Sequence, residues 1–99
     1  MTMLTLDEIE KILRTHRREL EERFRIKEIG VFGSYVRGEA TEESDVDILV
    51  DFYEVPSLLE FIELEEHLEK LLGIKVDLVM KSALKPKIGE HVKREVIYV

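Results

Sequence analysis

Cysteine is absent from the 99-residue sequence. Its absence excludes a disulfide framework, a thiolate metal site and a cysteine nucleophile. Long hydrophobic runs are also missing, because no stretch approaches the ~20 apolar residues of a membrane-spanning helix. The N-terminus reaches the acidic Asp7 and Glu8 too early for a secretory signal peptide. We therefore expect a cytoplasmic protein with no membrane contact, folded as a single domain over residues 1–99.

Asparagine and glutamine are absent too, whereas 37% of the residues are charged. Loss of these thermolabile amides together with enrichment in Lys, Glu and Arg is reported for hyperthermophile proteins, so we expect a thermophilic source. The formal net charge of -7 argues against direct nucleic-acid binding, which depends on Lys and Arg placed along the phosphates. A phosphate-bearing substrate would need a metal ion or a local cluster of cations.

The pattern of apolar residues predicts helices that alternate with short strands. Two capping boxes, Thr5–Glu8 and Ser57–Glu60, indicate where helices begin. Gly73 suits the left-handed position after the second of these helices. The expected order is helix 6–23, strand 26–32, strand 45–52, helix 58–72, strand 75–80, a short helix from Pro86 to about residue 94, and an apolar tail at 96–99. This order predicts an α/β fold in which helices pack on a small mixed sheet.

Residues 31–50, VFGSYVRGEATEESDVDILV, contain the residues best suited to chemistry. Gly33 and Ser34 end one expected strand, and Asp45 and Asp47 open the next. If the two strands are antiparallel neighbours, these four residues meet at one edge of the sheet. Strand alternation puts both carboxylates on one face, about 7 Å apart at ~3.4 Å per residue, where they can hold one divalent ion or bridge two. Gly33 permits close backbone approach, and the turn that begins at Ser34 offers N–H groups to a phosphate.

Gly-Ser, ten intervening residues and Asp-x-Asp resemble the signature of the DNA polymerase β-like nucleotidyltransferase superfamily. The segment GSYVRGEATEESDVDILV is similar in particular to the minimal nucleotidyltransferase branch, and the similarity extends to KVDLV and to the C-terminal EHVKREVIYV. The resemblance implies the polymerase β-like nucleotidyltransferase fold. In that family the two aspartates of the signature hold Mg²⁺ and a later strand supplies a third carboxylate, which maps these roles onto Asp45, Asp47 and Asp77.

The resemblance also implies phosphate-binding residues and a function. Gly33 and Ser34 match the residues that hold the nucleotide triphosphate, and Arg37 matches a basic residue that contacts its outer phosphates. Members of this branch commonly occur as antitoxins beside a HEPN-domain toxin, and some transfer AMP from ATP to a toxin tyrosine. The resemblance therefore implies an Mg²⁺-dependent nucleotidyltransferase that uses ATP, with two metal ions possible and a HEPN-type toxin as its partner.

The chemistry of the residues agrees with nucleotidyl transfer, an in-line displacement at the α-phosphorus. Asp77 suits either of two tasks, as the base that takes the proton of the acceptor hydroxyl or as a metal ligand. Aspartate is scarce, at five of the 22 acidic residues, so three aspartates at the family spacing are informative. Two other functions remain open: a binding module that neutralises its partner by covering it, and a transferase that acts on a small molecule.

Other polar residues have simpler explanations. Arg37 can be a surface partner of Glu39 or Glu42. Asp51 shares the strand face of the other aspartates but lies at the far end, so we expect it at the surface. The histidines lack the spacing of metal ligands and are not expected to bind metal: His16, His67 and His91.

Two further segments are candidates for contacts with partners. A mild basic stretch, more often a solvated helix face than a nucleotide or acidic-partner contact, comprises Lys81, Lys85, Lys87, Lys93 and Arg94. The apolar Tyr53, Val55 and Pro56 follow the second expected strand and should be exposed. A partner protein would lie across the edge of the sheet that carries Asp45, Asp47 and Asp77, here called the aspartate edge. These apolar residues are candidates for contact with it, although packing against the next helix is an equal alternative.

Overall fold

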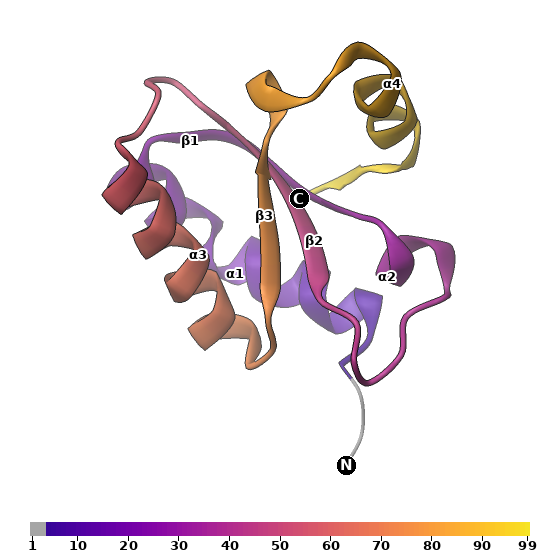
Figure 1. Ribbon diagram of the computed structural model, residues 1–99. Coiled ribbons are helices and arrows are strands. Elements are labelled where there is room, and N and C mark those ends of the chain that lie inside the picture. The colour runs from indigo at the N-terminus through magenta and orange to yellow at the C-terminus, as the bar shows by residue number, and fades with distance from the viewer. Residues whose placement is uncertain (1–3) are drawn as a thin grey trace.

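The computed structural model describes residues 4–99, which form a four-stranded sheet with packed helices (Figure 1). The helices are α1 (Leu6–Phe24), α2 (Ser34–Arg37), α3 (Leu58–Leu72) and α4 (Pro86–Glu95), and a 3₁₀ turn spans Lys81–Ala83. The strands are β1 (Ile26–Phe32), β2 (Val46–Phe52), β3 (Val76–Met80) and β4 (Ile97–Tyr98). None of the helices in this described part is long and apolar enough to cross a membrane.

The sheet is mixed, with the strand order β3-β2-β1-β4. β1 is antiparallel to both β2 and β4, whereas β2 and β3 are parallel. A parallel pair needs a long crossover connection, which α3 provides between β2 and β3. The predicted α/β class with a mixed sheet is therefore confirmed, and so is the antiparallel pairing of the two strands around the Gly-Ser and Asp-x-Asp motifs.

Both predicted capping boxes are present. The Glu8 N–H donates to Thr5 Oγ1 at 3.2 Å while the Thr5 N–H donates to Glu8 Oε1 at 3.0 Å, and Ser57 and Glu60 form the same pair of bonds at the start of α3. Loss of such a cap typically costs about 1 kcal/mol. α3 ends at Gly73, whose φ of 72° lies in the left-handed region that favours glycine.

The core lies between the sheet and the two long helices, α1 and α3. β2 turns Val46, Ile48 and Val50 inward, and each of these side chains is fully buried. The helices contribute buried residues at helical spacing: Ile9, Leu13 and Leu20 from α1, and Leu64, Leu68 and Leu72 from α3. Burial of a large aliphatic side chain stabilises the fold by about 1.5–3 kcal/mol. The two long helices thus pack their buried side chains with those of the sheet in one core.

The C-terminal tail differs most from the sequence-based expectation. Residues 96–99 were predicted only as an apolar tail, but Ile97 and Tyr98 form β4, which pairs with Val31 and Gly30 of β1. A Cβ on Gly30 would lie 2.7 Å from Val96 Cγ2 and 2.9 Å from the Ile97 carbonyl oxygen, so glycine is needed for this close approach. The tail is thereby seated on the edge of the sheet, directly beside the strand that carries the Gly-Ser motif.

Candidate functional site

Strand register brings the predicted aspartates together. In the antiparallel pair of β1 and β2, Phe32 lies opposite Asp47, and in the parallel pair of β2 and β3, Asp47 lies opposite Asp77. Paired residues of neighbouring strands point to the same face, so the carboxylates of Asp47 and Asp77 share one surface. Asp45 precedes β2 by one residue and is exposed, two positions from Asp47 on the chain. All three lie at the end of the sheet where β1 delivers Gly33.

Gly33 lies directly against the Asp47 carboxylate. Its φ of 81° is in the left-handed region, and a Cβ built there would fall 1.9 Å from Asp47 Oδ2. Both facts exclude a side chain at this position, since an L residue would be strained and would collide with the carboxylate. Close contact with Asp47 therefore explains why glycine occupies position 33 of the motif.

The carboxylate of Asp47 is destabilised by its surroundings. Burial raises the pKa of Asp47 to about 6, with further contributions from the negative charges of Asp77 and Asp45 and from a hydrogen bond with Asp77; the nearby Arg37 guanidinium acts in the opposite direction. Loss of solvent is thus the main cause of the raised pKa, and the neighbouring carboxylates add to it. A divalent cation would offset the charge of these carboxylates.

The donor set suits Mg²⁺, which takes one or two protein carboxylates and completes its shell with water and phosphate oxygens. Across residues 4–99 no three His, Asp, Glu or Cys side chains already form a closed metal-binding group. Asp45, Asp47 and Asp77 fit the ion only by the chemistry of their oxygen atoms, and they stay predicted ligands.

Arg37 ends the four-residue helix α2 and is held by two carboxylates. Its Nε donates to Glu39 Oε1 and its Nη1 donates to Glu95 Oε1, both at 2.7 Å. Glu39 was one of the two surface partners predicted for Arg37. Glu95 was missed, because it follows Arg37 by 58 residues and no local pattern connects them.

Ser34 begins α2 immediately after Gly33, as the motif requires. The N–H groups of Val36 and Arg37 donate hydrogen bonds to the Gly33 carbonyl oxygen at 3.0 and 3.1 Å, which closes the turn. The Gly33 N–H is also taken, since it donates to Glu95 Oε2 at 2.8 Å. Fewer N–H groups of this turn are thus available to a phosphate than the sequence suggests.

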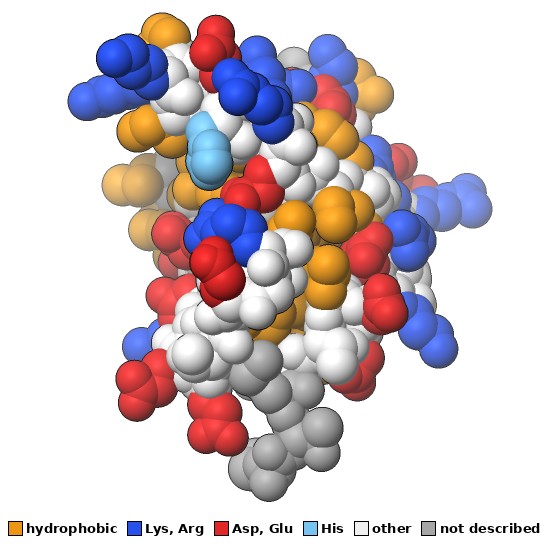
Figure 2. Space-filling view, turned by 90° about the vertical axis from the view of Figure 1, so that its right-hand side faces the viewer, with side chains coloured by type: hydrophobic (Ala, Val, Ile, Leu, Met, Phe, Trp, Pro, Cys, Tyr) orange, Lys and Arg blue, Asp and Glu red, His pale blue; other side chains and the backbone are white. Residues whose placement is uncertain are grey.

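The remaining polar candidates lie away from the aspartates. His16 and His67 lie 3.3 and 3.2 Å from carboxylate oxygens of Glu19, on the helical side of the sheet, and His91 is exposed on α4. Asp51, near the other end of β2, accepts a hydrogen bond from the Phe52 N–H at 3.0 Å. The basic stretch is largely exposed, and Figure 2 shows Lys and Arg side chains gathered at the end of the molecule formed by α4.

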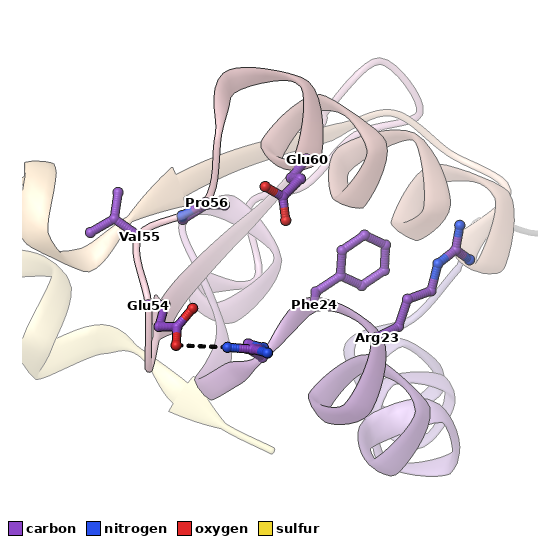
Figure 3. Close-up of a pocket in the computed structure, with 7 residues that line it drawn as sticks. Arg23, Phe24, Glu54, Val55, Pro56 and Glu60 are labelled. Carbon is purple, nitrogen blue, oxygen red and sulfur yellow. Dashed lines mark ion pairs between the residues drawn. The ribbon is translucent and has the colours of Figure 1, made fainter.

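Tyr53 and Val55 are 72% and 79% exposed, as predicted, and their contact with a partner stays a prediction. They follow the C-terminal end of β2, whereas the aspartates lie at its N-terminal end, and a seven-residue strand separates the two by roughly 20 Å. Val55 and Pro56 line a hollow of about 300 Å³ beside the Arg25–Glu54 ion pair of 2.7 Å (Figure 3). This hollow and the loop of residues 53–56 are therefore separate from the aspartate edge.

The fold and the aspartate edge define the class of a nucleotidyltransferase, and comparison with known proteins agrees. A family model described as the nucleotidyltransferase domain matches residues 13–99. A protein of Thermococcus cleftensis named protein adenylyltransferase MntA is 72% identical over 99 residues, which is 100% of each chain. A solved structure of a protein assigned as a minimal nucleotidyltransferase superposes with a TM-score of 0.73 at 43% identity and covers 90% of this chain and 93% of that one. A toxin-antitoxin crystal structure with AMP-PNP superposes with a TM-score of 0.70 at 26% identity and covers 93% of this chain and 69% of that one.

The chain belongs to the nucleotidyltransferase domain family. The resemblance to minimal nucleotidyltransferases is confirmed, and so is the predicted enzyme class. The roles of the individual residues stay predictions.

Proposed function

We propose that this protein is an Mg²⁺-dependent nucleotidyltransferase that transfers AMP from ATP to a tyrosine of a HEPN-type toxin and thereby neutralises it. The observation that carries the proposal is the register that sets Asp47 beside Asp77 and presses Gly33 against the Asp47 carboxylate. The names of the relatives support the acceptor class, since one is a protein adenylyltransferase and another is part of a toxin-antitoxin pair with bound AMP-PNP.

Asp45 and Asp47 would hold the metal, and Asp77 would act either as a third ligand or as the base that takes the proton of the acceptor hydroxyl. Bound Mg²⁺ would neutralise phosphate charge at the reacting centre. The protein's own contribution is to keep these carboxylates on one face, with no side chain at Gly33 between them and the turn. Burial first, and the charges of Asp77 and Asp45 second, raise the pKa of Asp47, and a bound cation would offset both effects.

The turn that follows β1 would receive the phosphates of ATP. Gly33 and Ser34 allow the triphosphate to approach the backbone, and Arg37 supplies positive charge to the outer phosphates, in bound ATP as well as in departing pyrophosphate. In the transfer, the tyrosine oxygen forms a bond to the α-phosphorus while the bond from that phosphorus to the bridging oxygen of pyrophosphate breaks. Asp77 is exposed on the shared face, where it can accept the proton of the tyrosine hydroxyl.

The acceptor arrives on another protein in this proposal. We propose that residues 1–99 act as one catalytic domain in the cytoplasm and that the partner supplies the hydroxyl. The chain's net charge of -7 would speed association with a basic partner through electrostatic steering.

A second candidate function, neutralisation by binding alone, is favoured by one observation. Five exposed apolar side chains fall within ten residues of the β2–α3 loop and the start of α3: Tyr53, Val55, Leu58, Leu59 and Ile62. Clusters of exposed apolar residues are typical of protein contacts. A partner bound there would cover this surface without contact with the aspartate edge.

Mass spectrometry separates the two candidates. The protein is incubated with the HEPN-type protein encoded beside it, ATP and Mg²⁺, and the partner's mass is measured. Catalysis adds AMP units to a tyrosine of the partner, and the Asp45→Asn/Asp47→Asn double variant adds none and no longer neutralises the toxin in cells. If the double variant still neutralises the toxin fully, binding alone is the function.

A further inference from the structure

The last residue of α4, Glu95, connects the C-terminal helix to the turn of the nucleotidyltransferase signature. Its Oε2 accepts a hydrogen bond from the Gly33 N–H at 2.8 Å, and its Oε1 accepts one from Arg37 Nη1 at 2.7 Å. The side chain is only 10% exposed. One carboxylate thus joins the backbone of the signature glycine to the guanidinium of the signature arginine.

This is an unfavourable place for an acid. The C-terminal end of a helix carries partial negative charge and stabilises cations, as the neighbouring Lys93 and Arg94 illustrate. Burial also acts to raise the pKa of Glu95, but the bonds from Arg37 and from the Gly33 N–H outweigh it and hold the pKa below its usual range. The ionised carboxylate is therefore stabilised by these two partners, at a position where helix formation alone would favour another residue.

Packing of the C-terminal strand determines where Glu95 lies. β4 begins two residues later and pairs with Gly30 and Val31 of β1, and the Val99 N–H donates to the Ile29 carbonyl oxygen at 3.0 Å. β1 in turn leads directly into Gly33. The tail that follows Glu95 and the turn at Gly33 are thus both connected to β1. Pairing of the tail with β1 therefore brings the Glu95 carboxylate next to Gly33.

The two carboxylates around Arg37 leave part of the guanidinium available. Of its five N–H donors, one on Nη1 bonds to Glu95 and the one on Nε bonds to Glu39. The remaining donors can meet an anion, and Arg37 lies close enough to Asp47 to act on that carboxyl's pKa. A guanidinium already fixed in orientation loses less entropy when it binds a phosphate.

We propose that Glu95 is a positioning residue for nucleotide binding, which holds Arg37 and the Gly33 turn in the arrangement that receives the phosphates of ATP. The inference rests on the proposed function and adds to it a residue outside the signature. Glu95 touches none of the reacting atoms and acts through its two partners. The alternative role for Glu95 is competition with phosphate for Arg37. In that case the removal of Glu95 would raise the affinity for ATP.

The test compares Glu95→Gln and Glu95→Ala with a matched control on the same helix, Glu90→Gln. Glu90 is 74% exposed and its nearest cation, Arg94, lies 3.9 Å away. ATP binding with Mg²⁺ is measured by titration calorimetry, and the KM for ATP and the kcat of transfer are measured separately. We expect Glu95→Ala to raise Kd and KM about 10-fold or more and to change kcat by less than about 3-fold, since the lost contact serves ground-state binding. Glu95→Gln should fall between, because its amide oxygen still accepts a hydrogen bond but carries no charge, and Glu90→Gln should match the wild type.

A double-variant cycle with Arg37→Ala shows whether Glu95 acts through the arginine. The combined loss in ATP affinity should be smaller than the product of the two single losses, because residues that serve one contact are not additive. Independent, multiplying losses would overturn the inference. So would tighter ATP binding by Glu95→Gln, which would establish competition, or unchanged binding by a folded Glu95→Ala protein. A wild-type protein that binds no ATP would refute the proposed function together with this inference, whereas wild-type binding that the Glu95 variants retain would refute the inference alone.

Discussion

Replacement of Asp47 by Asn removes a carboxylate whose pKa is raised by its surroundings. Burial, followed by the carboxylates of Asp77 and Asp45, raises the pKa of Asp47 from its ordinary 3.8 to about 6. A carboxyl whose pKa is higher in the folded protein than in the unfolded chain lowers the free energy of unfolding as the pH rises through the interval between the two values. We therefore predict that Asp47→Asn stabilises the metal-free protein above about pH 6 while it abolishes nucleotidyl transfer.

The size of the gain follows from the pKa of Asp47. A rise from 3.8 to about 6 is roughly two units, and at about 1.4 kcal/mol per unit the ionised carboxylate costs about 3 kcal/mol. The side chain is half-buried, so solvent screening reduces the effect, and we expect about 1–2 kcal/mol. In guanidinium chloride this gain corresponds to a midpoint higher by roughly 0.5 M.

Equilibrium unfolding in guanidinium chloride with EDTA measures the effect, at about pH 8 and again at about pH 4. The variant should exceed the wild type at the higher pH, and the difference should shrink toward the lower pH, where the wild-type carboxyl also becomes protonated when folded. Asp51→Asn is the control, because that carboxylate belongs to the same strand and lies outside the aspartate edge. An Asp47→Asn protein no more stable than wild type at the higher pH, or a gain independent of pH, would refute the reasoning.

Magnesium should reduce the difference in stability between the variant and the wild type. If Asp47 is a ligand, Mg²⁺ at ten times its Kd stabilises the wild type by about 1.4 kcal/mol through mass action, and it stabilises the variant less. Equal stabilisation of wild type and variant by Mg²⁺ would remove Asp47 from the metal site while the pH-dependent prediction could still hold.

Three more substitutions test the remaining parts of the site and the partner surface. Gly33→Ala should destabilise the protein by about 2 kcal/mol or more, since its Cβ would lie 1.9 Å from Asp47 Oδ2 and its φ is positive; thermal or denaturant unfolding measures this, and a neutral effect would contradict the close approach. Asp77→Asn should leave ATP binding largely intact and lower the transfer rate by ~10²-fold or more if Asp77 acts in catalysis; full activity in a single-turnover assay would make Asp77 structural. Leu59→Asp, on the exposed start of α3, should weaken partner binding in surface plasmon resonance by ~10-fold or more without an effect on ATP affinity, whereas undiminished binding would exclude this surface as a contact.

Local signals in the sequence were sufficient for most of the secondary structure. The bounds of β1 agree with the predicted strand 26–32, and α3 begins and ends where its capping box and Gly73 indicate. These features depend on residues within one or two turns of each other, so a single sequence contains them. β4 was not predicted as a strand, because two apolar residues have no recognisable period and pair only after β1 is in place.

The candidate site shows the opposite limit. Strand alternation predicts that Asp47 points away from the core, but it does not predict that Asp77 is its partner, since alternation fixes the face of a strand and not its neighbour. The resemblance to a family supplied Asp77 as a candidate, and the parallel register of β2 and β3 then brought the two together. Glu95 had neither a local pattern nor a family motif to indicate it, and only the path of the C-terminal tail shows its contact with Arg37. The exposure of Tyr53 was predicted, and its distance from the aspartates follows from the length of β2, which separates the two ends of that strand.

The balance of charge at the aspartate edge determines how an acidic protein can use a nucleotide. Arg37 is the cation that the signature supplies, and it is already paired with two carboxylates, so its positive charge is largely offset within the protein. The carboxylates that contact Arg37 or act on its charge outnumber it: Glu39, Asp47 and Glu95. A triphosphate brought to this edge without a metal ion would meet net negative charge, and in a chain of formal charge -7 no long-range attraction compensates for it. Nucleotide affinity should therefore depend on Mg²⁺ far more than on Arg37, since a divalent ion offsets the repulsion of the aspartates and the charge of the phosphates at the same time.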